Sequence, residues 1–270
     1  MKRFRFLTFS LDSSRNIFKT TESDYLEKMK EEQKEAISQK YGAAHFEEKF
    51  DRWLAIPKPV ISIVTEHTYL LEDIENAYVL GSYYASLTGA CCLGERIFNQ
   101  IILNVRDSYK STDWYKKIYR SNSFDSWDVG VQILRDWKII ESKTENDYRE
   151  LAKLRNESVH FQGKDQDLVL MTKKAITLIN SIVSDLFELK RENKFLLFFE
   201  VPGEIYLKKE AEDIPFVKAF YISHASLVGF KHSVKLAEGP RFGIVDPGPY
   251  KGADVTDSEF VRLRKEYINM

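Results

Sequence analysis

The feature that most constrains the fold is a helical hydrophobic period that runs from about residue 72 to residue 189 and then stops. Apolar and small residues recur there at spacings of three and four, which places them on one face of an α-helix. After Lys194 the pattern changes to short β-branched and aromatic runs between turn residues. The sequence therefore predicts an α+β protein, mainly α, with an antiparallel helical bundle and a small β-rich C-terminal part.

Within the periodic stretch we expect four helices, at about 72–106, 126–137, 145–161 and 168–189. Ser123 or Asp125 is suited to cap the second helix, because a short polar side chain can accept the free amides of a first turn. Gly163 is a stop signal after the third helix. A stretch of about 125 residues with this pattern is typical of a helical bundle.

The flanking sequence predicts three parts, 1–64, 65–192 and 193–270. The first holds a strand at 3–9 and a charged helix at 22–53 that Pro57 and Pro59 end. The third holds a hairpin of 195–201 and 204–207, since Pro202-Gly203 is a turn signal. We expect β-structure over 216–236 and a terminal helix over 258–267. This β-rich part either recruits the N-terminal strand or stands alone.

Charge and cysteine content limit the class of protein and its location. The net charge is −1, so any bound nucleic acid needs a local positive patch or a symmetric cleft. The only cysteines are the adjacent Cys91 and Cys92, which we interpret as buried thiols of a cytoplasmic protein. The stretch 76–94 has no charged residue, but its hydroxyl groups and glycines favour a buried helix over a membrane span. We therefore expect no membrane contact.

The third predicted helix carries a cation within its apolar stripe. Arg155 points out between apolar neighbours on one side of this helix, namely Tyr148, Leu151, Ala152 and Val159. A guanidinium in that position either has a carboxylate partner or lines a cleft. His160 follows five residues later and can move protons near neutral pH. Asn156 lies one helical turn before it and can orient the imidazole.

Glu95 is the predicted partner of Arg155. It also lies in the apolar stripe of its helix, between the two cysteines and Phe98. Oppositely charged side chains on the apolar sides of two packed helices are natural partners. We expect a Glu95–Arg155 ion pair, which is either part of a functional site or a purely structural buried pair.

Arg155-Asn156-Glu157-Ser158-Val159-His160 resembles the R-x4-6-H motif of HEPN domains, which are small α-helical bundles. The resemblance covers about residues 65–191. It implies a metal-independent endoribonuclease that acts as a homodimer, in a defence or toxin–antitoxin system with a possible antitoxin or other protein partner. It implies Arg155 and His160 as catalytic residues with Asn156 in support, and it is in keeping with an acidic residue such as Glu95 on a preceding helix.

The chemistry of these side chains agrees with that assignment. Cleavage of RNA needs a base for the 2′-hydroxyl proton, an acid for the leaving oxygen and donors for the phosphorane charge. An imidazole can serve as base or acid, and a guanidinium fork matches phosphate oxygens. Two copies across a symmetric interface would supply both proton-transfer groups. The chain has no metal-ligand spacing, so we expect neither a metal nor another cofactor.

Two other readings of the motif stay open. A non-catalytic HEPN module would bind a nucleotide or a protein partner through the same face. A helical interaction protein could contain the motif by coincidence, since short motifs often match by chance. Whether Arg155 lines a cleft or points into solvent separates the coincidence from the first two readings.

Overall fold

The structure, a computed structural model, describes residues 3–7, 24–57, 60–124, 126–159, 167–199, 203–236, 242–252 and 254–270. Contacts divide the chain into two units, residues 11–188 and residues 1–10 together with 189–270. The first unit is helical and the second contains the sheets. The expected α+β composition, mainly α, is confirmed.

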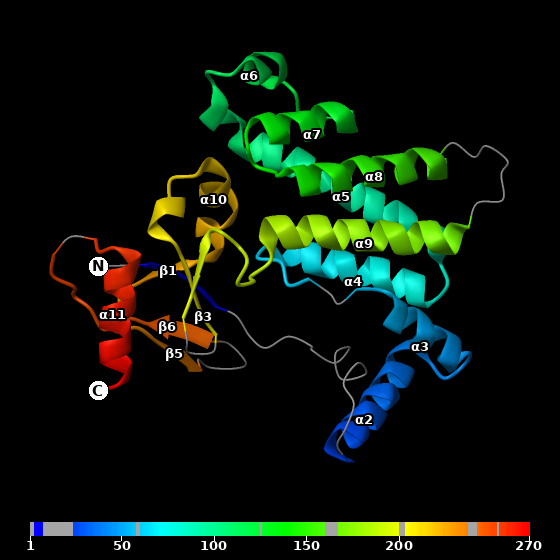
Figure 1. Cartoon of the computed structure of the whole chain (residues 1–270), viewed down its shortest axis with the longest axis horizontal. Coiled ribbons are helices and arrows are strands. Elements are labelled where there is room, and N and C mark those ends of the chain that lie inside the picture. The colour runs from blue at the N-terminus through cyan, green and yellow to red at the C-terminus, as the bar shows by residue number, and fades with distance from the viewer. Residues whose placement is uncertain are drawn as a thin grey trace. The chain divides into compact units, whose positions relative to one another are not determined.

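The helical unit holds eight described α-helices (Figure 1). They are α2 (Asp24–Tyr41), α3 (Phe46–Ala55), α4 (Thr65–Val79), α5 (Tyr83–Val105), α6 (Asp113–Ile118), α7 (Trp127–Asp136), α8 (Ser142–Val159) and α9 (Leu168–Phe187). A 3-10 helix, Arg106–Tyr109, links α5 to α6. Short polar side chains cap the first turn of several of these helices. The Ser126 hydroxyl accepts a hydrogen bond from the Val129 amide at α7, and the Asp167 carboxylate accepts one from the Leu170 amide at α9.

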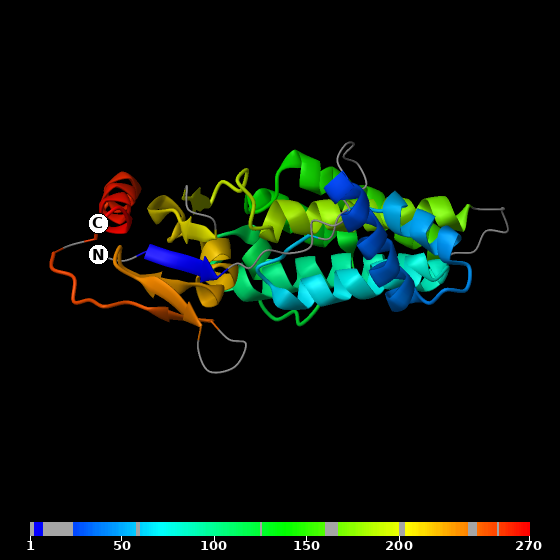
Figure 2. The same ribbon diagram turned by 90° about the horizontal axis from the view of Figure 1, so that it is seen from below.

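Helix α5 is the centre of this unit, because it packs against α4, α7, α8 and α9. Its core-facing apolar side chains are enclosed, and Leu87, Ile97 and Phe98 are 0% exposed. Both views show α9 alongside α4 (Figures 1 and 2). The charge-free stretch 76–94, expected to be one buried helix, instead spans the end of α4, the turn at Gly81 and the first half of α5. No helix within the described ranges is long and apolar enough to cross a bilayer.

Glycines interrupt two of the predicted helices. The expected helix over 72–106 is wrong, because the chain turns between α4 and α5 at Gly81, where φ is +84°. A left-handed residue ends a helix, and glycine adopts it without steric cost. Gly42, with φ +79°, likewise divides the charged helix expected over 22–53 into α2 and α3. Helix α6 was not predicted at all.

The second unit is built on a four-stranded antiparallel sheet in the order β2-β3-β1-β4. Its strands are β1 (Arg3–Leu7), β2 (Leu196–Phe198), β3 (Glu204–Leu207) and β4 (Ser226–Val228). The N-terminal strand is therefore recruited by the C-terminal part, one of the two arrangements expected. Arg5 lies opposite Tyr206 on one side and Ser226 on the other.

A two-stranded sheet of β5 (Ser233–Leu236) and β6 (Phe242–Val245) and the terminal helix α11 (Asp257–Ile268) complete the second unit. The terminal helix was predicted, whereas β6 was not. Continuous β-structure over 216–236 is wrong, because Pro215–Phe220 forms helix α10. Pro215 takes the first helical position, which its fixed φ favours, and its buried neighbours Phe216, Val217 and Phe220 follow at helical spacing.

The observed units divide the chain differently from the three predicted parts. Strand β1 belongs with residues 189–270, and helices α2 and α3 belong with the bundle. An isolated bridge between Ser62 and Glu188 holds the segment before α4 against the end of α9. The predicted helix end at Phe161 and its stop at Gly163 lie outside the described residues.

Candidate functional site

Helix α8 holds Arg155 at the edge of the bundle core. Tyr148 and Leu151 are 0% exposed and fix one face of α8 against the interior. Arg155 follows Leu151 by four residues and is half-buried, while Asn156 is exposed. The Arg155 guanidinium donates from Nη1 to Oδ1 of Asn156 at 3.2 Å. The side chains of these two adjacent motif residues are therefore in direct contact.

Arg155 and Asn156 line a pocket between α7 and α8. Its volume is about 330 Å³, and its walls are Trp127, Asp128, Arg149, Ala152, Lys153, Arg155 and Asn156. That volume lies at the lower end of the range for small-ligand sites. Of the two positions left open for Arg155 by the sequence, a cleft or open solvent, the structure shows Arg155 in the lining of a pocket.

The cations of this pocket differ in how their charge is compensated. Arg149 bonds Glu145 at 2.9 Å and Asp128 at 3.3 Å, and Lys153 pairs with Glu150. Arg155 has no ion pair with any carboxylate in the described part of the chain. Its guanidinium is thus the cation of the pocket that can take an anionic ligand without first giving up a described carboxylate.

The predicted Glu95–Arg155 ion pair is not formed. Glu95 Oε2 accepts a hydrogen bond from the indole Nε1 of Trp127 at 3.0 Å. Trp127 begins α7 and lines the pocket. The donor to Glu95 is therefore the indole of Trp127 and not the guanidinium of Arg155. Glu95 contributes to the site through this pocket wall.

The charges of Glu95 and Arg155 nevertheless both act on the Cys91 thiol. Burial and the neighbouring Cys92 thiol raise the pKa of Cys91 to about 12, with a lowering contribution from Arg155 and a raising one from Glu95. Cys91 is buried as expected, but Cys92 is exposed, which corrects the expectation for the second cysteine. The protonated Cys91 is a poor nucleophile, because the thiolate is the reactive form.

His160 lies outside the described residues. The last described turn of α8 carries Ser158, whose hydroxyl donates to the Arg155 carbonyl oxygen at 2.9 Å. The structure thus places two of the predicted site residues, Arg155 and Asn156, in one pocket, and a third, Glu95, behind its wall.

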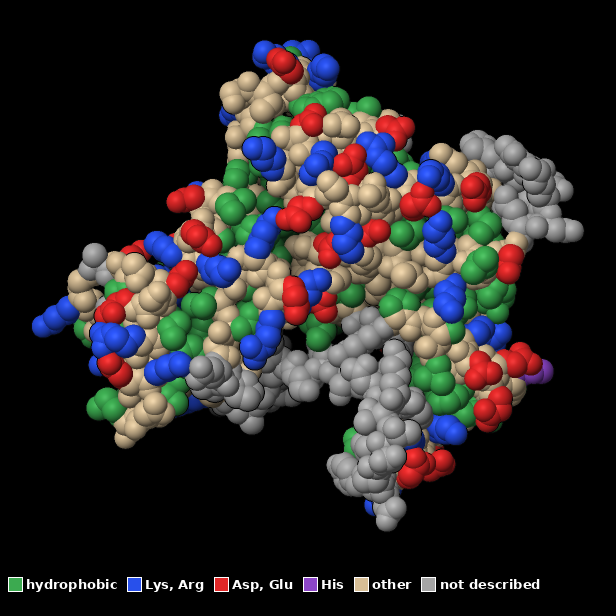
Figure 3. All heavy atoms as spheres, viewed as in Figure 1, with side chains coloured by type: hydrophobic (Ala, Val, Ile, Leu, Met, Phe, Trp, Pro, Cys, Tyr) green, Lys and Arg blue, Asp and Glu red, His purple; other side chains and the backbone are tan. Residues whose placement is uncertain are grey.

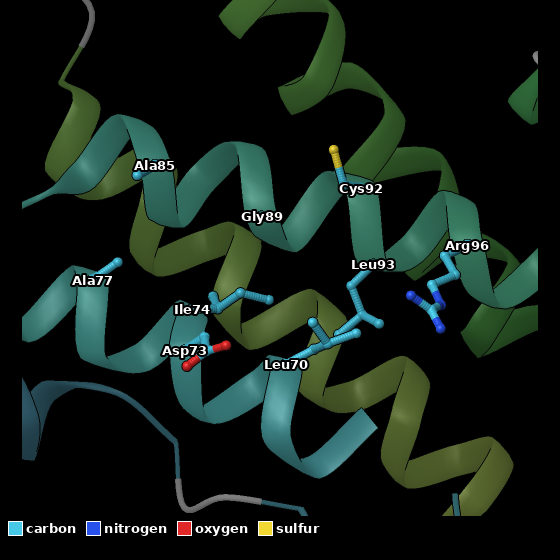
Figure 4. Close-up of a pocket in the computed structure, with 9 residues that line it drawn as sticks. All are labelled: Leu70, Asp73, Ile74, Ala77, Ala85, Gly89, Cys92, Leu93 and Arg96. Carbon is cyan, nitrogen blue, oxygen red and sulfur yellow. The ribbon is translucent and has the colours of Figure 1, made fainter. Parts of the chain in front are cut away.

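A second pocket of about 370 Å³ lies between α4 and α5 (Figure 4). Most of its lining is apolar or small: Leu70, Ile74, Ala77, Ala85, Gly89, Cys92 and Leu93. Asp73 and Arg96 reach toward it from its two walls. Its lining is thus mainly apolar with one carboxylate and one guanidinium, whereas the Arg155 pocket combines three cations with the amide of Asn156.

Sequence reasoning missed a buried polar cluster in the second unit. Arg5, Glu204 and Arg264 are between 5% and 7% exposed and join β1, β3 and α11. Arg264 bonds Glu204 at 2.6 and 3.2 Å, and Arg5 lies 3.8 Å from the same carboxylate. Tyr206 donates to Glu204 at 2.6 Å. These residues come from distant segments, so no local spacing could have indicated them.

His232 belongs to the same cluster and is held in its neutral form. Its Nδ1–H donates to the Gly229 carbonyl at 2.6 Å, so Nε2 is left to accept from Arg5 Nη1 at 2.6 Å. Burial, together with the Arg264 charge, lowers the pKa of His232 to about 4. The imidazole is 1% exposed, as expected for a core histidine, and its enclosed position indicates a structural role.

The described residues contain no group of three or more His, Cys, Asp or Glu side chains arranged to hold a metal ion. Comparison of the chain with protein-family models, with curated proteins and with solved structures finds no match. The Arg155 pocket is therefore interpreted from its own chemistry and from the motif that ends α8.

Proposed function

We propose that the helical unit is a HEPN-like module and that the protein is a metal-independent endoribonuclease acting at the Arg155 pocket. The observation that carries the proposal is the half-buried Arg155 guanidinium, which lines a pocket beside Asn156 without a described carboxylate partner. A cation in that state binds phosphate oxygens without first breaking an ion pair. His160 follows five residues later in the sequence.

In the proposed reaction His160 takes the proton of a ribose 2′-hydroxyl. The 2′-oxygen then forms a bond to the adjacent phosphorus, and the bond from phosphorus to the 5′-oxygen of the next nucleotide breaks. That leaving oxygen takes a proton from a second acid. The products are a 2′,3′-cyclic phosphate and a free 5′-hydroxyl. Arg155 stabilises the charge that develops on the non-bridging oxygens.

A second acid is available if two copies of the chain meet at a two-fold axis. Each copy then contributes one Arg155 and one His160, so that one imidazole acts as base and the other as acid. We propose a homodimer on this chemical ground. The same class of nuclease works in defence or toxin–antitoxin systems, and the proposed protein partner is an antitoxin that covers the pocket.

The test is cleavage of single-stranded RNA by the chain purified without an antitoxin, in the presence of EDTA. We expect cutting without added metal and a 2′,3′-cyclic phosphate end, because the attacking group is the neighbouring hydroxyl. His160→Asn should lower the rate by about 10² to 10⁴-fold, the usual contribution of a general base or acid. Arg155→Lys should lose most activity, since an ammonium cannot replace the guanidinium fork.

Two matched variants control for nonspecific damage. His45→Asn changes an exposed histidine at the start of α3, and Arg191→Lys changes an exposed arginine that follows α9. Both should cut RNA at the unchanged rate. A requirement for magnesium, or full activity in His160→Asn, would disprove the mechanism. RNA binding without cleavage in every preparation would favour the non-catalytic module that binds a nucleotide or protein partner.

A further inference from the structure

A short segment beyond one end of α7 concentrates positive charge and aromatic rings. We call residues 106–120 the α6 lobe; it comprises the 3-10 helix, the turn after it, α6 and the two residues that follow. It contains five Lys or Arg, two Asp and four aromatic residues. Lys and Arg side chains gather over this part of the surface in Figure 3. A chain of net charge −1 thus has the local patch that binding a polyanion requires.

Three cations of the lobe are available to a ligand. Lys110, Lys117 and Arg120 are exposed, and none of them forms an ion pair with a carboxylate in the described chain. Lys116 differs, because it pairs with Asp113 at 2.9 Å. Surface cations without an ion pair gain more from a phosphate than paired ones, since no ion pair is lost.

Two of these three cations lie over aromatic rings. The Lys117 ammonium is 4.8 Å from the centroid of Trp114, and the Arg120 guanidinium is 5.1 Å from that of Tyr119. The rings of Tyr115 and Tyr119 are stacked, with centroids 6.0 Å apart and planes 30° from parallel. Tyr119 is 44% exposed. Positive groups beside partly exposed aromatic rings are what single-stranded nucleic acid binds, through phosphates and unstacked bases.

The rings are fixed by contacts with the C-terminal end of α7 and by one hydrogen bond within the lobe. Trp114 Nε1 donates to Asp136 at 2.6 Å, and the Tyr115 hydroxyl donates to Asp107 at 3.2 Å. Tyr109 stacks on Trp137 with centroids 4.3 Å apart and planes at 3°. Because these anchors already order the platform, a bound base would cost little further side-chain entropy.

Helix α7 connects the lobe to the Arg155 pocket. Asp136 and Trp137, which anchor the lobe, lie at its C-terminal end, while Trp127 and Asp128 line the pocket at its N-terminal end. The helix has 10 residues, so at 1.5 Å per residue its ends are about 14 Å apart. One flexible strand can therefore reach both sites.

We infer that the α6 lobe binds single-stranded RNA and leads the strand along α7 to the Arg155 pocket; the inference rests on the nuclease function proposed above. An anionic membrane fits the lobe less well. Its one aliphatic side chain above alanine size, Ile118, is 4% exposed, so the lobe offers no aliphatic group to insert between lipids. An acidic protein surface would use the cations but not the ring faces.

The inference is tested by RNA affinity in the His160→Asn chain, which keeps the strand intact. The probe is a fluorescent single-stranded RNA of about 12 nucleotides, within the usual site size of single-strand binders. Lys117→Glu with Arg120→Glu should weaken binding at least about tenfold and reduce the slope of log K against log salt by about 1.4, for two lost phosphate contacts. Tyr119→Ala should weaken it about 5- to 100-fold through lost stacking.

Controls of the same kind lie elsewhere on the helical unit. Lys28→Glu with Lys173→Glu changes the net charge equally at exposed positions of α2 and α9, and Tyr69→Ala removes an exposed ring of α4. We expect each to keep at least half of the parent affinity. Equal losses in the lobe and control variants would overturn the inference, as would equal binding of duplex RNA or binding of anionic vesicles in place of RNA.

The two proposals fail in different ways. If no RNA is ever cut but the lobe variants still lose affinity, the lobe inference stands and the nuclease proposal does not. If RNA is cut and the lobe variants bind and cut it like the parent chain, the lobe inference is wrong. Melting temperatures of all variants, compared with the parent, show that the lost affinity is not lost folding.

Discussion

At the scale of single residues, the most strongly constrained side chain is Glu204. It is the acidic centre between two nearly enclosed arginines, Arg5 and Arg264. Burial opposes its charge, but hydrogen bonds from Arg264 and Tyr206 prevail, so the pKa of Glu204 lies below its ordinary value. Removing this charge would leave two buried guanidinium groups facing each other without compensation.

We therefore predict that Glu204→Gln lowers the free energy of unfolding by about 3 to 5 kcal/mol. Glu259→Gln on α11 is the matched control. Glu259 bonds Arg262 at 2.6 Å, but both side chains are largely in solvent, so its loss should lower the free energy of unfolding far less than the loss of Glu204. Urea unfolding of the two variants measures the difference, and similar losses in both would show that burial does not decide the effect.

The site residues differ in how far the sequence could predict them. The helical angle from Tyr148 and Leu151 was enough to place Arg155 at the edge of the core. The partner of Glu95 was not predictable in this way, since Trp127 comes from α7 and reaches Glu95 only after packing. Periodicity gives the direction of a side chain within its own helix, whereas the partner depends on how helices meet.

At the scale of elements, close approach of helices depends on glycine. A methyl group on Gly130 of α7 would lie 2.7 and 2.8 Å from the ring of Phe98 on α5. That ring cannot move aside easily, because it is 0% exposed and packs against Trp127 and Tyr148. Since Trp127 also lines the Arg155 pocket, the seating of α7 on α5 shapes the candidate site.

Gly130→Ala is accordingly predicted to destabilise the chain by about 1 to 3 kcal/mol, because the clash outweighs the gain in helix propensity. Gly243→Ala in β6 is the control, since nothing lies within 4 Å of its added methyl group. That substitution should be neutral or stabilising by up to about 1 kcal/mol through the unfolded chain. Thermal and urea unfolding compare the two, and a stabilised Gly130→Ala would refute the close approach.

The existence of elements was predictable where a period was long, and their ends were not. Helices α8 and α9 and the terminal helix follow from sustained patterns. The turn at Gly81 was not predicted, because the apolar spacing continues across it, although its positive φ ends α4. Helix α10 was hidden, because its phenylalanines and Val217 have strand propensity, and Pro215 was the one local signal for a helix start.

At the scale of the whole molecule, the chain returns to its beginning to complete the second unit. Strand β1 lies between β3 and β4, and its Phe6 is 2% exposed and meets the ring of Tyr221 edge-on. The alternating residues at 3–9 predicted a strand, but they did not indicate which strands would pair with it. Strand pairing joins segments about 200 residues apart, as Arg5 and Tyr206 show, and no local pattern specifies such a contact.

Because the chain forms two units, we predict that a cavity in the core of one unit destabilises that unit alone. Phe6→Ala should lose about 3 to 5 kcal/mol of packing in the second unit, and Phe98→Ala a similar amount in the helical unit. Hydrogen exchange separates the two effects, because amides report local opening as well as global unfolding. In Phe6→Ala we expect faster exchange in β3, β4 and α10, with α5 and α9 unchanged.

Phe98→Ala should give the opposite pattern, with faster exchange in α5, α8 and α9 and unchanged rates in β3 and β4. Each variant thus serves as the control for the other, since both remove a buried phenylalanine ring of the same size. Such a result would mean that the polar cluster around Glu204 stabilises only the unit that contains it, and that the Arg155 pocket depends on the helices alone. If either variant accelerates exchange equally throughout the described chain, the two units unfold as one and the predicted independence is wrong.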